Sequence, residues 1–261
     1  MIKIGLCQIE GNSNPEENLK KAREFFRDAA EKGIELLVFP EMFMALPGNG
    51  ILPSHVAPAA SRFLAEMAGL AKEYGINCIF GFWEPSEDPH RPFNSASLIN
   101  PEGVEVARYR KLHLFDALKI RESKTSSPGQ TLPPVVRIKN LLIGLAICYD
   151  LRFSLVFDHL ASQNADLVVV ISAWYAGTGK EDHWLTLLKA RAIEYTCYVA
   201  GCNMVGLRFC GRSAAFDPFG MPLGDAGEEE GLLEITVKKE RVISVREKLP
   251  VLQHRRKDLF Q

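Results

Sequence analysis

Residues 141–172 read LLIGLAICYDLRFSLVFDHLASQNADLVVVIS, and this stretch decides the fold class of the chain. Two short apolar runs, LLIGLAIC (141–148) and DLVVVIS (166–172), are typical of strands that are buried on both faces. The segment between them, RFSLVFDHLASQNA (152–165), predicts a helix. A strand, a helix and a second apolar strand in succession indicate an α/β fold in which helices cover a sheet.

The same alternation of strands and helices continues on both sides of this stretch. Further strands are predicted over residues 2–9, 34–41, 76–84, 197–203 and 231–237. Helices are predicted between the capping residue Asn14 and the stop Gly33, over 59–75 and 181–196, and in the charged C-terminal segment. Hairpins over 93–111 and 213–224 make the sheet mixed, and the simplest assignment is a single domain over residues 1–261.

Composition argues against several classes of function. The 261 residues carry a formal net charge of -1 and no block of basic residues, so we expect no nucleic-acid partner. No apolar stretch reaches the roughly 18 residues of a membrane-spanning helix. The segment MIKIGLCQIE (1–10) lacks the basic and apolar regions of a signal peptide. We therefore expect a cytoplasmic protein with no membrane partner.

The cysteines give a second indication of the compartment. They stand at positions 7, 78, 148, 197, 202 and 210, and they form no C-x-x-C pair. Most of them lie inside apolar runs, which predicts reduced and buried thiols. No pair of ligands has the spacing of a zinc site, so we expect neither a metal ion nor another cofactor.

Three polar residues stand at the ends of predicted strands: Glu41 after LLVFP, Lys111 after VARYR and Cys148 after LLIGLAI. In open α/β sheets ligands bind outside the carboxyl ends of the strands, so one site could contain all three side chains. A carboxylate could take the proton of the thiol, and the thiolate could then attack a carbonyl carbon to form a thioester. Lys111 and the backbone N–H of Tyr149 would stabilise the oxyanion that forms.

Taken singly, each of these residues has a simpler explanation. A cysteine in an apolar run is more often a packing residue of the core, and Glu41 and Lys111 could be solvated turn residues. A different catalytic pair is open as well, because Cys148 could be activated by one of three histidines, at positions 113, 159 and 183.

Three motifs in this order, VFPEMF (38–43), YRKLHLF (109–115) and GLAICYDLRF (144–153), resemble those of the nitrilase superfamily, also called the carbon–nitrogen hydrolases. The resemblance covers nearly the whole chain. It implies a four-layer α-β-β-α sandwich with mixed sheets. It also implies assembly as a homodimer or a higher homo-oligomer.

The resemblance implies a role for each motif residue. Glu41 matches the general base, Lys111 the lysine that stabilises the oxyanion, and Cys148 the nucleophile. Glu122, which lies in RESKT within a long loop-like segment at 111–134, is similar to a second glutamate that orients the substrate and the lysine.

The resemblance also points to residues that would bind the substrate. The loop after the strand at 166–172 generally lines the substrate pocket in this family, so Trp174 and Tyr175 are predicted to bind substrate together with Tyr149. Asp150 and Arg152, just after the nucleophile, are interpreted as partners in an ion pair.

The residues after the nucleophile narrow the reaction. Nitrilases usually have Trp-Glu after the cysteine, whereas this chain has Tyr149 and Asp150 and looks more like the amidase branches, including the omega-amidases. The resemblance therefore implies an amidase that cleaves the C–N bond of a small carboxamide through a thioester on Cys148 and releases ammonia. The loop after residue 172 has no arginine to bind a dicarboxylate-like substrate, which counts against an omega-amidase. The alternatives are an N-carbamoyl amino acid hydrolase, a nitrilase, and a non-catalytic binding or scaffold protein.

Overall fold

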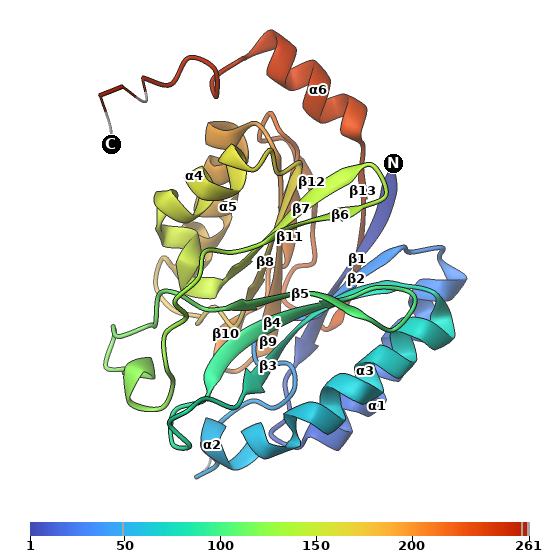
Figure 1. Cartoon of the computed structure of the whole chain (residues 1–261), viewed down its shortest axis with the longest axis vertical. Helices are drawn as coiled ribbons and strands as arrows, with labels where there is room; N and C mark the ends of the chain where they lie inside the picture. The colour runs from blue at the N-terminus through green and yellow to red at the C-terminus, as the bar shows by residue number, and fades with distance from the viewer. Residues whose placement is uncertain (49, 257, 260–261) are drawn as a thin grey trace.

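The computed structural model describes residues 1–48, 50–256 and 258–259. Its strands form two sheets that pack face to face, and helices cover the outer face of each sheet (Figure 1). The first sheet contains β1 (Ile2–Glu10), β2 (Leu36–Val38), β3 (Asn77–Glu84), β4 (Phe93–Ile99), β5 (Glu105–Arg110) and β13 (Gly231–Val237). The second contains β6 (Val135–Ile138), β7 (Leu141–Ile147), β8 (Leu167–Ser172), β9 (Tyr198–Gly206), β10 (Phe209–Cys210), β11 (Ala214–Phe216) and β12 (Pro222–Asp225).

Both sheets are mixed, as the two hairpins predict. In the first sheet β1, β2 and β3 run parallel, while β4, β5 and β13 pair antiparallel with their neighbours. In the second sheet β7, β8 and β9 run parallel, and β6, β10, β11 and β12 are antiparallel. The two sheets are joined where the end of β1 pairs with the end of β9, with Ile9 opposite Met204.

The helices complete the layers. The first sheet is covered by α1 (Pro15–Glu31) and α3 (Ala60–Tyr74), and the second by α4 (Ser154–Ser162) and α5 (Lys180–Tyr195). The remaining helical segments are α2 (Pro53–Val56), α6 (Lys239–Lys248) and the 3₁₀ turns η1 (Ala57–Ala59), η2 (Glu122–Lys124) and η3 (Cys148–Arg152). No helix in the described ranges is long and apolar enough to cross a membrane.

Alternating side chains on the buried strands explain why the layers form. Val169 on β8 packs into the core between the sheets with Ile4 of β1, whereas its neighbour Val170 packs against α4 and α5. On the other side, Phe63 of α3 packs against the outer face of the first sheet. Because successive residues of a strand point to opposite faces, a continuous apolar strand fills two cores at once. The predicted α/β class and the α-β-β-α sandwich are confirmed.

Most predicted elements are found, with a few differences at their ends. The Asn14 side chain caps α1 by accepting a hydrogen bond from the Glu16 N–H, and α3 ends at Gly75 in the left-handed conformation. The strand predicted over 34–41 stops at Val38, because Pro40 has no N–H to donate and the chain turns there. The short elements α2, β6 and β10 and the 3₁₀ turns η2 and η3 were not predicted.

Candidate active site

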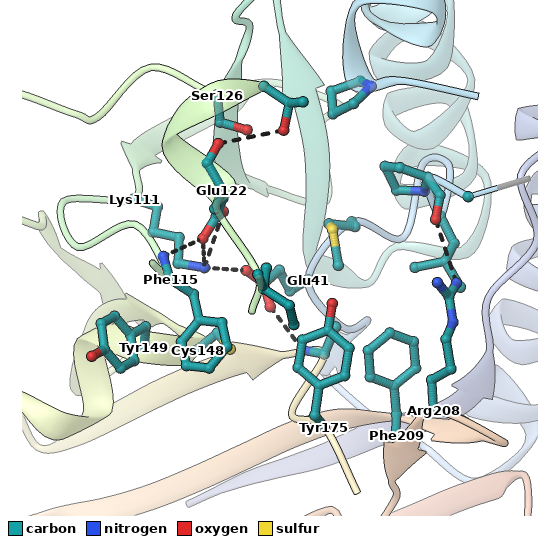
Figure 2. A pocket seen from close by; sticks show the side chains of 18 of the residues that line it. Glu41, Lys111, Phe115, Glu122, Ser126, Cys148, Tyr149, Tyr175, Arg208 and Phe209 are labelled. Carbon is teal, nitrogen blue, oxygen red and sulfur yellow. Dashed lines mark hydrogen bonds and ion pairs between the residues drawn. The ribbon is translucent and has the colours of Figure 1, made fainter. Parts of the chain in front are cut away.

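The predicted catalytic side chains lie in one pocket, although they come from both sheets. Glu41, Lys111, Glu122 and Cys148 all line a cavity of about 350 Å³, and Figure 2 shows the first three joined by hydrogen bonds. The predicted substrate-binding residues Tyr149, Trp174 and Tyr175 line the same cavity. The strand ends identified in the sequence therefore do converge.

Glu41 is presented by a tight turn after β2. Met42, the next residue, has a φ of 54°, and this turn lies directly against Gly81 of β3. A Cβ on Gly81 would lie 2.5 Å from the Met42 nitrogen and 2.7 Å from the Glu41 Cα. Only a glycine at position 81 allows the two backbones to approach this closely.

The Glu41 carboxylate is buried, and both of its oxygens accept hydrogen bonds. Oε1 accepts from Lys111 Nζ at 2.8 Å and from Asn94 Nδ2 at 2.7 Å. Oε2 accepts from the backbone N–H of Ala173 at 2.8 Å. Because Ala173 follows β8 and Lys111 follows β5, this one carboxylate connects the two sheets.

Lys111 is held by two carboxylates. Its Nζ lies 2.8 Å from Glu41 Oε1 and 2.9 Å from Glu122 Oε2, and its side chain is almost fully buried. Burial alone would lower the pKa of Lys111, but the charges of Glu122 and Glu41 outweigh it and raise the pKa well above its usual value. Lys111 therefore remains an ammonium at neutral pH and can donate hydrogen bonds but not act as a base.

Glu122 lies in η2 and faces the site, not the neighbouring basic residues of its own loop. Its Oε2 accepts from the Phe115 backbone N–H at 2.7 Å as well as from Lys111. Its Oε1 accepts from Asn94 Nδ2 at 3.0 Å. The second glutamate thus fixes the Lys111 side chain and the loop that carries Phe115.

Cys148 begins η3 with a φ of 46°, a left-handed conformation that is uncommon for a residue with a side chain. It is partly exposed to the cavity, whereas the other five cysteines are buried. Desolvation, followed by the charge of Glu41, raises the pKa of the Cys148 thiol well above its usual value, and Lys111 opposes this shift. At neutral pH the thiol is therefore protonated, and it needs a base in order to attack.

Asp150 holds the turn of the nucleophile against the segment that carries Lys111. It is fully buried and accepts hydrogen bonds from the Tyr109 hydroxyl at 2.8 Å and from the His113 backbone N–H at 3.1 Å. The interpretation of Asp150 and Arg152 as an ion pair is wrong. Arg152 instead contacts the His183 ring at 3.2 Å, because the Asp150 carboxylate points toward the first sheet.

The histidines that could have formed a Cys–His pair have other partners. His113 Nδ1 lies 2.7 Å from Asp150 Oδ1, and its ring stacks on Phe153. His159 Nε2 lies 3.1 Å from the Pro133 carbonyl oxygen. None of the hydrogen bonds found within residues 1–48, 50–256 and 258–259 joins a histidine to Cys148.

Aromatic side chains form the wall of the pocket. Phe115 contacts Tyr149 edge-to-face with ring centroids 4.9 Å apart, and it stacks with Tyr175 at 6.1 Å (Figure 2). Trp174 is almost fully buried, and its indole N–H donates to the Lys180 carbonyl oxygen at 2.8 Å. These rings give the cavity an apolar wall beside the carboxylates and the thiol.

Sequence reasoning missed Asn94, whose amide group bridges Glu41 and Glu122. The hairpin of β4 and β5 places Asn94 beside Lys111, whose backbone N–H donates to the Asn94 carbonyl oxygen at 2.9 Å. An asparagine inside a buried strand is unusual and was the available signal. The sequence also did not predict that four basic residues line the pocket, at positions 121, 152, 180 and 208.

No metal centre is indicated by the side chains. The described part of the chain contains no group of three or more His, Cys, Asp or Glu residues that could hold a metal ion.

Comparisons with known proteins agree with the geometry. The family model described as Carbon-nitrogen hydrolase matches residues 3–247. The chain is 38% identical to the deaminated glutathione amidase of Synechocystis sp. (strain PCC 6803 / GT-S), over 95% of this chain and 96% of that protein. It is 30% identical to Omega-amidase NIT2 of Mus musculus, over 99% of this chain and 96% of that protein.

A solved amidase has the same fold. The structure of the amidase from Nesterenkonia sp. AN1 matches with a TM-score of 0.85 at 28% identity, covering 99% of this chain and 95% of that one. That protein is a glutamate-to-glutamine mutant, and it shows covalent addition of the acetamide moiety of fluoroacetamide at the active-site cysteine.

Proposed function

This chain belongs to the carbon–nitrogen hydrolase family, and from that premise we propose how its own residues carry out the reaction. The chain is an amidase that acts on non-peptide C–N bonds, and it hydrolyses a small carboxamide through a thioester on a cysteine. The roles of Glu41, Lys111, Glu122 and Cys148 are our assignment, and the contacts among them support it.

The first half of the reaction forms the thioester. Glu41 takes the proton of the Cys148 thiol as Sγ bonds to the amide carbon and the carbonyl electrons move to oxygen. Lys111 Nζ and the Tyr149 backbone N–H stabilise that oxyanion. When the tetrahedral intermediate collapses, the C–N bond breaks, and Glu41 returns its proton to the leaving nitrogen as ammonia departs.

The second half releases the acid. A water molecule gives a proton to Glu41 as its oxygen bonds to the thioester carbon. Collapse of this second intermediate breaks the C–S bond, and the proton passes to the departing thiolate. Glu122 does not exchange protons in these steps, since its contacts with Lys111 and the Phe115 N–H assign it to positioning.

One observation carries the proposal. A single ammonium is shared by two carboxylates in a pocket that also exposes Cys148, the one cysteine among the six described that is partly accessible. In a protein core this arrangement would cost stability, because two carboxylates and an ammonium are desolvated together. Chemistry at Cys148 explains why the chain keeps it.

The test replaces the nucleophile. Cys148→Ala is expected to lower ammonia release from small amides by at least about 10⁴-fold, because no other thiol lines the cavity within the described ranges. Fluoroacetamide should add one acetamide group to the wild-type protein, and peptide mass spectrometry should map it to Cys148. Cys197→Ala is the matched control, because it removes a buried thiol that does not line this cavity. This variant should release ammonia as the wild type does and should still be labelled by fluoroacetamide at Cys148. Turnover by Cys148→Ala close to that of the wild type would contradict the assignment.

We also propose a cytoplasmic location, a single domain and a homodimer or higher homo-oligomer. The six free cysteines are compatible with a reducing compartment. Exposed apolar side chains such as Leu155 on α4 and Ile193 on α5 are of the kind that subunit interfaces bury. Native mass spectrometry of the purified chain would measure the number of subunits.

A further inference from the structure

Lys180 is a buried cation without an acidic partner among the residues that the structure describes. It is the first residue of α5, it is only 9% exposed, and it lines the cavity that contains Cys148. Within the part of the chain that the structure describes, no carboxylate lies within ion-pair distance of its Nζ, and no hydrogen bond to Nζ is found. Lys111, the other buried lysine of this cavity, has two carboxylate partners.

Aromatic rings and a second cation surround the Lys180 ammonium. Its Nζ lies 4.8 Å from the centre of the Trp174 ring and 5.4 Å from that of Phe115. The guanidinium of Arg152 lies 4.7 Å from the centre of the same Trp174 ring. The faces of these rings offset part of the desolvation of the ammonium, but two positive charges beside one indole still repel each other.

The position of Lys180 at the start of α5 does not explain why its charge is buried. A positive charge in the first turn of a helix interacts unfavourably with the helix dipole. The neighbouring residues Glu181 and Asp182 carry the negative charge that a helix N-terminus favours. Burial, followed by the charge of Arg152, lowers the pKa of Lys180. A buried charge without a partner is destabilising, so a ligand that supplies the partner is the simplest reason for its position.

The other basic residues at the cavity differ from Lys180. Arg121 and Arg208 are exposed, and water can solvate them. Glu41 and Glu122, the negative groups of the cavity, already share Lys111. An anionic group of a bound molecule would therefore be repelled from the carboxylates and attracted to the Lys180 end of the cavity.

We propose that Lys180 binds a carboxylate of the substrate, so that the preferred substrates are amides that also carry a free carboxylate. This inference rests on the proposed function, because it places the amide group of the same molecule at Cys148. The loop after residue 172 has no arginine that could bind a substrate carboxylate. Lys180 provides the positive charge for that contact instead. Arg152, whose guanidinium lies 4.7 Å from the centre of the Trp174 ring, strengthens the positive potential there.

The first experiment compares two substrates of equal length. Glutaramate carries a carboxylate at the end opposite its amide, and pentanamide has a methyl group in that place. Wild-type protein should have a higher kcat/KM for glutaramate. Lys180→Met, which keeps the length and removes the charge, should lower the ratio of the two kcat/KM values by about tenfold to hundredfold, the usual effect of losing a charged hydrogen bond. The loss should appear mainly in KM for glutaramate.

Two further variants serve as controls. Lys180→Arg should recover most of the ratio, because it keeps the positive charge. Lys189→Met removes an exposed lysine from the same helix, away from the cavity, and should leave the ratio unchanged. An unchanged ratio in Lys180→Met, or an equal loss for both amides, would overturn the inference. Ammonia release from neither amide by the wild-type protein would instead count against the proposed function.

A binding measurement tests carboxylate recognition by Lys180 separately from catalysis at Cys148, because it needs no turnover. Glutarate should bind saturably to the Cys148→Ala protein in calorimetry, and adding Lys180→Met should weaken that binding by about tenfold or more. If Lys180→Met folds poorly, Lys180→Gln replaces it in this experiment, because it also removes the charge. Equal affinity for glutarate with and without Lys180, or no saturable binding of glutarate, overturns the inference.

Discussion

At the scale of single residues, the contacts of Lys111 explain how the site distributes its charges. The ammonium lies between Glu41 and Glu122, but the surroundings of these two carboxylates differ. Glu41 belongs to a turn that also contacts Ala173, close to the end of β8, whereas Glu122 binds the loop through the Phe115 N–H. In the proposed mechanism the first exchanges a proton with Cys148, and the second holds Lys111 in position.

The residue-scale prediction separates these two roles. Glu41→Gln keeps the shape and the hydrogen-bonding capacity of the side chain but cannot accept the thiol proton. We expect kcat for amide hydrolysis to fall by about 10²–10⁴-fold while Tm changes little. Steady-state ammonia release and thermal unfolding measure the two quantities.

Glu66→Gln is the matched control for that variant, since Glu66 is an exposed residue of α3 that does not line the cavity, and it should keep full activity. If Glu41→Gln turned over amides nearly as fast as the wild type, another group would have to be the base.

At the scale of elements, the hairpin of β4 and β5 brings two parts of the site together. Its register places Ser95 opposite Arg110, so that Asn94 and Lys111 are neighbours at the open end of the hairpin. Beside it, Glu84 at the end of β3 accepts hydrogen bonds from three side chains on the two hairpin strands, those of Ser95, Arg108 and Arg110. This cluster holds together the strand ends that carry Asn94 and Lys111.

The element-scale prediction concerns Glu84. Burial alone would raise the pKa of its carboxyl group, but hydrogen bonds from Arg110, Arg108 and Ser95 outweigh it and lower the pKa. The pKa of Glu84 is therefore lower in the folded protein than in the unfolded chain, where it is about 4.3. The ionised carboxylate stabilises the folded protein above that unfolded value, and this stabilisation is lost as the pH falls through the folded-state pKa.

Glu84→Gln should therefore lower the free energy of unfolding by about 1–2 kcal/mol at pH 7, a modest value because both arginines are partly solvated. Urea unfolding at a series of pH values measures the difference, which should shrink below pH 4. Glu102→Gln in the exposed turn of the same hairpin is the control. A difference that did not depend on pH would show that the charge of Glu84 is not what stabilises the hairpin.

At the scale of the whole molecule, the active site exists only because the two sheets pack together. Glu41 and Lys111 come from the first sheet, whereas Cys148 and Ala173 come from the second. The fully buried Asp150 adds a second connection through the Tyr109 hydroxyl. The apolar core between the sheets therefore determines the distances among the catalytic groups.

The whole-molecule prediction tests that core. Leu145 on β7 is buried between the sheets, and Leu145→Ala should lower the free energy of unfolding by about 2–5 kcal/mol through lost burial and the cavity left behind. Leu207→Ala, in the exposed turn between β9 and β10, makes the same chemical change and should alter the free energy of unfolding by less than about 0.5 kcal/mol. Denaturant unfolding measures both, and similar losses would mean that Leu145 does not support the sandwich.

Local sequence predicted most elements because their signals lie within a few residues of one another. The Asn14 cap, the Gly75 stop and the apolar run of 141–148 could be recognised without knowing what packs against them. Local signals failed at element ends, since the left-handed conformation of Cys148 depends on its turn and not on its own preference. They also failed for β6, a four-residue strand at the edge of the sheet.

The order of strands and helices and the α/β class could be predicted from the sequence, and its three motifs identify Glu41, Lys111 and Cys148 as the candidate catalytic residues. The groups that surround them follow from the packing of the two sheets: the Asn94 bridge, the contacts of Asp150 with the first sheet, and Lys180, which has no acidic partner in the described ranges. The physical reason is the separation along the chain. Glu41 and Ala173 are joined by a hydrogen bond although 132 positions separate them, and such contacts arise from the packing of two sheets, which no local pattern specifies.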